Sequence, residues 1–201
     1  LLGSKVTGRP VKWVSTRSES FIADAHGRDN VADAELGIDK NGKFLGLRVH
    51  NLVAMGAYTQ PGTDSGAFSN VGTMAGVYQL PAAYVDVTAV YSHTNIIRPF
   101  RGNGRPEAAF IIERLVDLAA DEIGMDKAEI RRINMIPPQM MPYQTALSFN
   151  YDTGEFEKVL DEALEMIDYK GFEARRAEAR KRGKLRGIGI SFTIEKAGAP
   201  G

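Results

Sequence analysis

The sequence predicts an α+β fold, with antiparallel or mixed strands in the first half, helices in the second half and one closing strand. Residues 1–100 are mainly loops and runs of alternating apolar and polar residues, the pattern of half-buried strands. Residues 101–183 carry apolar positions at helical spacing, and residues 184–201 return to a strand-like run. Strands and helices are thus segregated along the chain, instead of alternating as in a parallel α/β protein.

The clearest element of the first half is a β-hairpin. Residues 33–39 and 44–55 alternate in polarity, and Asn41-Gly42 between them adopts positive φ at little cost. β-Branched and aromatic residues predict two further strands. These strands are residues 11–17 and 84–93, with a tight turn or a single helical turn at residues 18–22. Residues 56–76 are rich in Gly, Ser and Thr, and we expect a loop there with one small-residue helix at 67–75.

The second half contains the predicted helices. The longest, residues 106–123, places its apolar residues on one face and is followed by Gly124, a residue type typical of the position after a helix. Asp126 is placed to cap the next helix, with Glu129 where a capping box requires it. In order, the predicted elements are helices at 106–123, 127–134, 154–167 and 170–182 and a strand at 185–194.

The composition excludes several classes of function. The 25 basic and 25 acidic side chains give a formal net charge of zero, so no overall charge attracts nucleic acid or an anionic membrane. No apolar run approaches the roughly 20 residues of a membrane span. Because the chain has no cysteine, it cannot hold disulfides, thiolate metal sites or Cys-ligated iron–sulfur clusters. Nothing in it requires an oxidising compartment and no signal peptide is evident, so we expect a cytoplasmic location.

Residues 98–107, with the sequence Arg-Pro-Phe-Arg-Gly-Asn-Gly-Arg-Pro-Glu, form the candidate binding loop. Gly102 and Gly104 let the backbone approach a ligand closely, and a helix that starts at Pro106 presents unpaired N–H groups and a partial positive charge. With the arginines beside them, these features predict a site for an anionic group. The same residues are also ordinary turn residues with solvated charges, so the pattern alone leaves both interpretations open.

The sequence alone identifies no catalytic group. His26, His50 and His93 are scattered without the spacing of metal ligands, and each is better explained as structural. No Ser–His–Asp order, Walker loop or zinc pattern appears. We therefore predict no catalytic residue and no metal ligand in this chain.

Several motifs in the chain resemble one family. They are Val77-Tyr78-Gln79-Leu80-Pro81, Tyr84-Val85-Asp86-Val87 and Phe100-Arg101-Gly102-Asn103-Gly104-Arg105-Pro106-Glu107-Ala108, supported by His26-Gly27-Arg28-Asp29 and Arg131-Arg132-Ile133-Asn134. The sequence resembles the molybdenum-cofactor-binding large subunit of the xanthine dehydrogenase/aldehyde oxidase family, nearest the aerobic carbon-monoxide-dehydrogenase-like large chains. The chain starts with Leu1, and we expect residues 1–201 to be an internal fragment of the molybdenum-cofactor-binding region.

The resemblance implies a hydroxylase that inserts oxygen from water into a C–H bond of a small-molecule substrate. The cofactor would be Mo-molybdopterin or its cytosine dinucleotide, with iron–sulfur clusters and FAD in partner chains or missing regions of a hetero-oligomer. By the same resemblance, Arg101 lies against the cofactor, and Phe100, Gly102, Asn103 and Gly104 complete the binding loop. The family's catalytic glutamate has no counterpart here, so the fragment alone is expected to be inactive.

Departures from the family pattern bear on the substrate. Carbon monoxide dehydrogenases place a copper-binding Cys where this chain has Gly102, so carbon monoxide oxidation is not expected. Xanthine-type enzymes place a substrate-stacking Phe at Asn103 and a substrate-orienting Arg near Ser69, so a purine is not expected either. The resemblance then implies an aldehyde or N-heterocycle in a pocket near Asn103 and Ser69. A non-catalytic assembly module of the same fold and a generic anion- or phosphate-binding domain remain open as alternatives.

Overall fold

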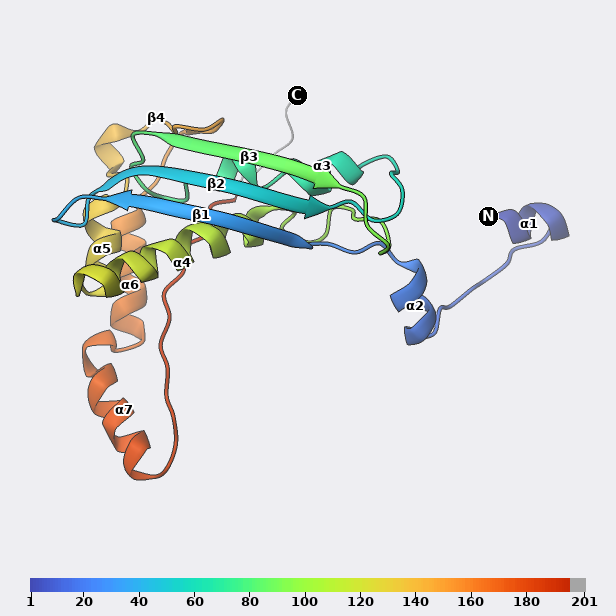
Figure 1. Ribbon diagram of the computed structural model, residues 1–201. Helices are drawn as coiled ribbons and strands as arrows, with labels where there is room; N and C mark the ends of the chain where they lie inside the picture. Colours follow the sequence, from blue (N-terminus) through green and yellow to red (C-terminus); the bar gives the residue numbers. More distant parts are fainter. Residues whose placement is uncertain (196–201) are drawn as a thin grey trace.

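The computed structural model of the chain describes residues 1–195, apart from the side chains of residues 64–66 (Figure 1). Its centre is a three-stranded sheet in the order β1-β2-β3, made of β1 (Asn30–Ile38), β2 (Phe44–Ala54) and β3 (Ala83–Val90). β1 and β2 pair antiparallel, whereas β2 and β3 pair parallel. The prediction of an α+β fold, with mixed strands early and helices later, is confirmed.

The β1–β2 hairpin forms where Asn41-Gly42 predicts it. Gly42 has a φ of 82°, which suits glycine. The Oδ1 atom of Asp39 accepts hydrogen bonds from the backbone N–H groups of Asn41 (2.8 Å) and Lys43 (2.9 Å). The turn is therefore held by its own residues, which explains why local sequence sufficed to locate it.

A long crossover joins the parallel strands β2 and β3, because such strands cannot be linked by a tight turn. It contains α3 (Thr63–Phe68) and the 3₁₀ turn Val71–Thr73, in place of the single helix expected at 67–75. The crossover and α4 (Arg105–Ile123) pack on one face of the sheet (Figure 1). The other face is exposed, and Leu52 and Tyr84 lie on it.

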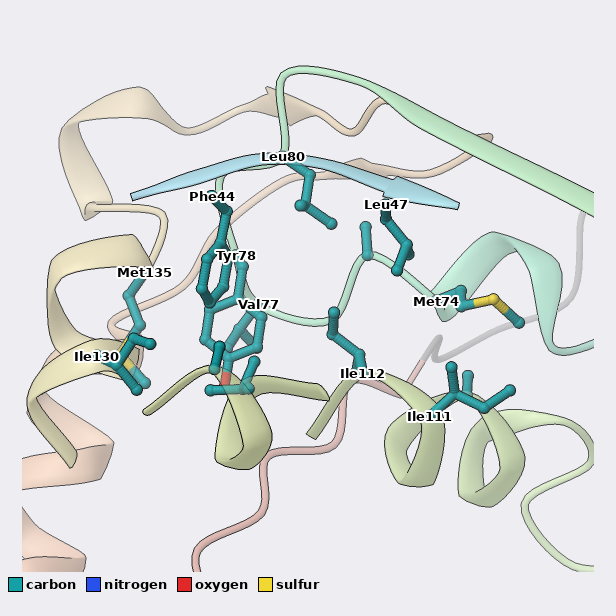
Figure 2. Close-up of a cluster of buried hydrophobic side chains, with 14 of the residues drawn as sticks. Phe44, Leu47, Met74, Val77, Tyr78, Leu80, Ile111, Ile112, Ile130 and Met135 are labelled. Carbon is teal, nitrogen blue, oxygen red and sulfur yellow. The ribbon is translucent and has the colours of Figure 1, made fainter. Parts of the chain in front are cut away.

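The core lies between the sheet and these segments (Figure 2). Alternate residues of β2 point into it, as the period of a strand requires. α4 contributes one apolar face, as the helical spacing predicts. The buried side chains drawn in Figure 2 include Phe44 and Leu47 from β2, Met74, Val77, Tyr78 and Leu80 from the crossover, Ile111, Ile112 and Ile130 from the helices, and Met135, which follows α5.

Three more helices follow α4, close to the predicted positions: α5 (Lys127–Asn134), α6 (Phe156–Met166) and α7 (Phe172–Lys181). The carboxylate of Asp126 caps α5 by accepting from the N–H groups of Ala128 (2.8 Å) and Glu129 (3.1 Å), as expected of an N-cap aspartate. The short strands β4 (Tyr143–Gln144) and β5 (Asn150–Tyr151) lie between α5 and α6. Two 3₁₀ turns, Pro138–Met140 and Tyr169–Gly171, complete this half.

The N-terminal segment differs from the prediction. It contains α1 (Leu2–Thr7) and α2 (Arg17–Ala23), and α1 lies well away from the sheet (Figure 1). The helical alternative at residues 18–22 is thus confirmed, but the strand at residues 11–17 is wrong. Trp13 and Val14 are exposed there, and within residues 1–195 no strand pairs with this segment. β-Propensity stabilises a strand only when a neighbour is present.

The closing strand predicted over residues 184–201 is also wrong for its described part, since residues 184–195 have no regular secondary structure. The apolar alternation that suggested it is real: Ile190, Phe192 and Ile194 pack against the core. The carbonyl oxygen of Ile190 accepts a hydrogen bond from the Nη2 group of Arg131 (3.0 Å), whereas in a sheet it would accept one from a neighbouring strand. Residues 196–201 lie outside the described part of the chain.

Arg131 also belongs to a buried polar network beneath α4. Its Nε donates to Glu113 (3.0 Å), and the Tyr78 hydroxyl donates to the other oxygen of the same carboxylate (2.6 Å). Burial raises the pKa of Glu113 and outweighs the opposing effect of Arg131. Burial, and then the charge of Glu113, raise the pKa of Tyr78 well above its usual value. The network joins the crossover, α4 and α5 at one point.

Candidate functional site

The loop before α4 has an unusual backbone. Gly102, Asn103 and Gly104 have φ values of 87°, 25° and 87°, three consecutive residues with positive φ. A Cβ on Gly104 would lie 2.4 Å from the carbonyl carbon of Ser69, so this position requires glycine for space as well as for conformation. The turn is closed by hydrogen bonds from Asn103 N to Phe100 O (2.7 Å) and from Arg105 N to Gly102 O (3.0 Å).

Several backbone N–H groups of this loop form no hydrogen bond. Within residues 1–195, the backbone N–H groups of Gly102, Gly104 and Glu107 have no acceptor. They lie at the N-terminus of the 19-residue α4, where the helix dipole adds a partial positive charge. The side chain of Arg101 is exposed and forms no ion pair with the described residues. The loop therefore offers a guanidinium and unpaired amides to an anion.

The two residues expected near a substrate, Asn103 and Ser69, lie together. The Nδ2 group of Asn103 donates to the Oγ atom of Ser69 at 2.9 Å. Ser69 follows α3, so the crossover brings it to the loop from far away in the sequence. The inner side of the loop is thus packed against residues 69–70, and Arg101 remains accessible on the outer side.

Sequence reasoning did not select Arg28 as a site residue, although its motif contributed to the family resemblance. Its Nη2 group donates to the backbone oxygen of Arg101, and its guanidinium lies 5.1 Å from the centre of the Phe100 ring. Its Nε lies 3.7 Å from a carboxylate oxygen of Glu107. Arg28 therefore contacts the loop at three points.

Hollows border the loop on both sides. A groove of about 490 Å³ between β1 and α4 is lined by Arg28 and Glu107 among others, and Phe110 stands at its surface. A depression of about 570 Å³ lies between α2 and the loop, where Phe100 and His26 contribute to its wall. Arg101 lines neither hollow. Its side chain projects from the described residues rather than into a pocket that they form by themselves.

The fold and the loop define an α+β domain with a glycine-rich loop at a helix N-terminus. Residues 1–135 match the family of molybdopterin cofactor-binding domains, and the chain belongs to this family. The unpaired amides, the exposed Arg101 and the glycine-dependent loop fit an anionic group. The resemblance to the large chains of molybdenum enzymes is confirmed.

Individual relatives agree with the family. The carbon monoxide dehydrogenase large chain of Hydrogenophaga pseudoflava is 36% identical, over 99% of this chain and 26% of that protein. The nicotine 6-hydroxylase large subunit of Paenarthrobacter nicotinovorans is 34% identical, over 98% of this chain and 24% of that protein. Quinoline 2-oxidoreductase from Pseudomonas putida 86 has a similar structure, with a TM-score of 0.82 at 32% identity over 90% of this chain and 23% of that one.

The chain spans about a quarter of the length of these relatives. Within residues 1–195, no helix combines the length and the apolar character needed to cross a membrane.

Proposed function

We propose that this chain is part of a molybdenum hydroxylase and contributes the Arg101 loop to the cofactor pocket. The observation that carries the proposal is the loop itself, with three consecutive positive φ values, open amides and an exposed arginine at the start of α4. This loop lies within residues 1–135, the part that matches the cofactor-binding family. The cofactor, when bound, supplies the chemistry that transfers oxygen derived from water to the substrate.

In this proposal the residues of the loop bind and orient the cofactor. The Arg101 guanidinium donates charged hydrogen bonds to its anionic groups, and the amide of Gly102 donates at close range because no side chain intervenes. Phe100 lies at the edge of the same loop, and Asn103 presents its amide on the side of Ser69. The cofactor is Mo-molybdopterin or its cytosine dinucleotide form.

The substrate that we propose is an aldehyde or an N-heterocycle. The names of two relatives include the N-heterocycles nicotine and quinoline, which supports this class. Carbon monoxide is disfavoured although carbon monoxide dehydrogenases are among the relatives, because Gly102 has no thiol to bind copper. Asn103 and Ser69 would give the substrate pocket a polar wall.

The other groups that the reaction needs would lie outside this chain. No cysteine is present, so cysteine-ligated iron–sulfur clusters must lie in other domains or subunits, together with the flavin and the catalytic base. One relative is named as the gamma subunit of a dehydrogenase complex, which supports a hetero-oligomer. We therefore propose that the chain acts only as part of a larger assembly.

Molybdenum and pterin analysis of the full-length protein, purified from its host grown with molybdate, tests the proposal. We expect about one molybdenum per polypeptide in the wild type and about tenfold weaker cofactor retention in Arg101→Ala, the effect of losing a charged hydrogen bond. Arg114→Ala is the control, because Arg114 is an exposed arginine of α4 that lies outside the loop.

The alternatives predict different outcomes. A folded wild type without molybdenum would contradict the proposal and favour a non-catalytic assembly module. Competition by nucleotides or inorganic phosphate, without any bound pterin, would favour a generic phosphate-binding domain. Activity can then be screened with aldehydes and N-heterocycles, using the wild type and Arg101→Ala side by side.

A further inference from the structure

Backbone pairing brings residues 26–28 to the loop from a distant part of the sequence. His26 N donates to Ile96 O (2.8 Å), and Arg98 N donates to His26 O (2.9 Å), so this segment pairs like a strand with residues 96–98. The backbone at Gly27 lies close to the loop, since a Cβ on Gly27 would lie 3.3 Å from the Cβ of Phe100. The position of Arg28 beside the loop is thus fixed by its neighbours in the chain.

Arg28 itself has a φ of 64°, in the left-handed region that residues other than glycine rarely adopt. Such a conformation persists only where the surrounding structure determines it, and it is concentrated at functional sites. Because of this backbone turn, the side chain points back across the loop, where it contacts Phe100, Arg101 and Glu107.

Each of these contacts acts on a different part of the loop. The hydrogen bond to the Arg101 carbonyl fixes the peptide that follows Arg101, and the stacking on Phe100 fixes the residue before it. The pairing with Glu107 joins both to the first turn of α4. The Oε2 atom of Glu107 is buried without a hydrogen bond, so Arg28 provides its nearby positive charge.

The two arginines therefore have separate tasks. The charge of Arg28 faces Glu107 and its side chain is only 31% exposed, whereas Arg101 is exposed and has no acidic partner within residues 1–195. We propose that Arg28 is a positioning residue, which holds the Arg101 loop in the shape that presents Arg101 to the cofactor. This proposal rests on the function proposed above, but its structural part concerns only the order of the loop.

The test uses the full-length protein with the variants Arg28→Ala and Arg28→Lys, and with Arg114→Ala as the control from the same groove. Hydrogen exchange of the Asn103 and Arg105 amides, which close the loop by hydrogen bonds to Phe100 and Gly102, reports loop order. Molybdenum content reports cofactor retention, and kcat and KM are measured separately. We expect about tenfold faster exchange in Arg28→Ala, confined to the loop, with a fall in molybdenum content and in kcat of the remaining loaded enzyme.

Arg28→Lys should give an intermediate result, because an ammonium keeps the charge beside Glu107 but cannot reproduce the planar, multiply bonded guanidinium. If Arg28→Ala unfolds, hydrogen exchange will be faster in the sheet as well as in the loop. The loop exchange and the molybdenum content of Arg28→Lys, compared with the wild type, then test the proposal. Loop exchange and molybdenum content equal to the wild type in the folded variant would overturn the proposal.

Failure of the proposed function has a different signature. In that case Arg101→Ala leaves the molybdenum content unchanged, or no molybdenum is present at all, while Arg28→Ala still accelerates exchange in the loop. That result would keep Arg28 as the residue that orders the loop, and would overturn its task of presenting Arg101 to a cofactor.

Discussion

Replacement of Arg131 tests the physical account of the core. Arg131 is fully buried and donates to Glu113 (3.0 Å) and Asp117 (2.9 Å). Arg131→Met keeps an unbranched side chain with similar helix propensity but removes the charge. It leaves the carboxylate of Glu113, whose side chain is 6% exposed, without its cation.

The expected loss is large because the remaining charge is buried. Breaking a buried ion pair by removing one partner costs about 3–5 kcal/mol, which corresponds to at least about a hundredfold change in an opening equilibrium. Protonation of Glu113 limits the loss, since each pKa unit is worth about 1.4 kcal/mol. The variant also loses the hydrogen bond from Arg131 to the Ile190 carbonyl, which holds residues 190–194 on the core.

The loss of folding stability in Arg131→Met should depend on pH. The pKa of Glu113 is raised in the folded protein, so between its ordinary value and the raised value the folded state holds a proton that the unfolded state lacks. Stability therefore falls as pH rises through this window. Arg131 lowers the pKa of Glu113, so Arg131→Met extends the window upward. The difference between wild type and variant should grow as pH rises above the raised pKa of Glu113 in the wild type.

Hydrogen exchange of the slowest α4 amides, compared with the wild type at equal pH, measures this loss in the full protein. Arg132→Met is the matched control, because Arg132 is the next residue of α5 and forms partly exposed ion pairs with Glu157 and Asp161. Adding Glu113→Gln to Arg131→Met should restore much of the stability. Equal losses in the two arginine variants, or a loss independent of pH, would contradict the role assigned to the buried ion pair.

Two further substitutions test the loop and a helix cap. Gly104→Ala should lower the melting temperature more than Gly124→Ala, because both glycines have positive φ but only the Cβ at Gly104 meets backbone, at 2.4 Å from Ser69; equal shifts would contradict this account. Asp126→Ala should cost about 1 kcal/mol through loss of the α5 cap, measured by thermal unfolding. A shift no larger than that of Glu122→Ala, a change at an exposed acidic residue, would contradict the second prediction.

The elements that the sequence predicted well are those held by nearby residues. Asn41-Gly42 fixed the hairpin, and Asp126 located the start of α5, because the hydrogen bonds that stabilise them lie within a few residues. The predictions of strands at residues 11–17 and 185–194 were wrong because a strand requires a partner, and local composition does not supply one.

The candidate site also has features that the sequence predicted and features that it did not. Sequence was enough to locate the loop at residues 100–104, with its glycines and the helix N-terminus behind it, and to identify the family to which the chain belongs. The contact of Ser69 with Asn103 and the contacts of Arg28 with the loop become visible only in the folded chain. These contacts join residues far apart in the chain, and their formation depends on the crossover and on the pairing of residues 26–28 with 96–98. Local physical chemistry specifies turns and caps, whereas the packing of the whole chain specifies which distant side chains meet.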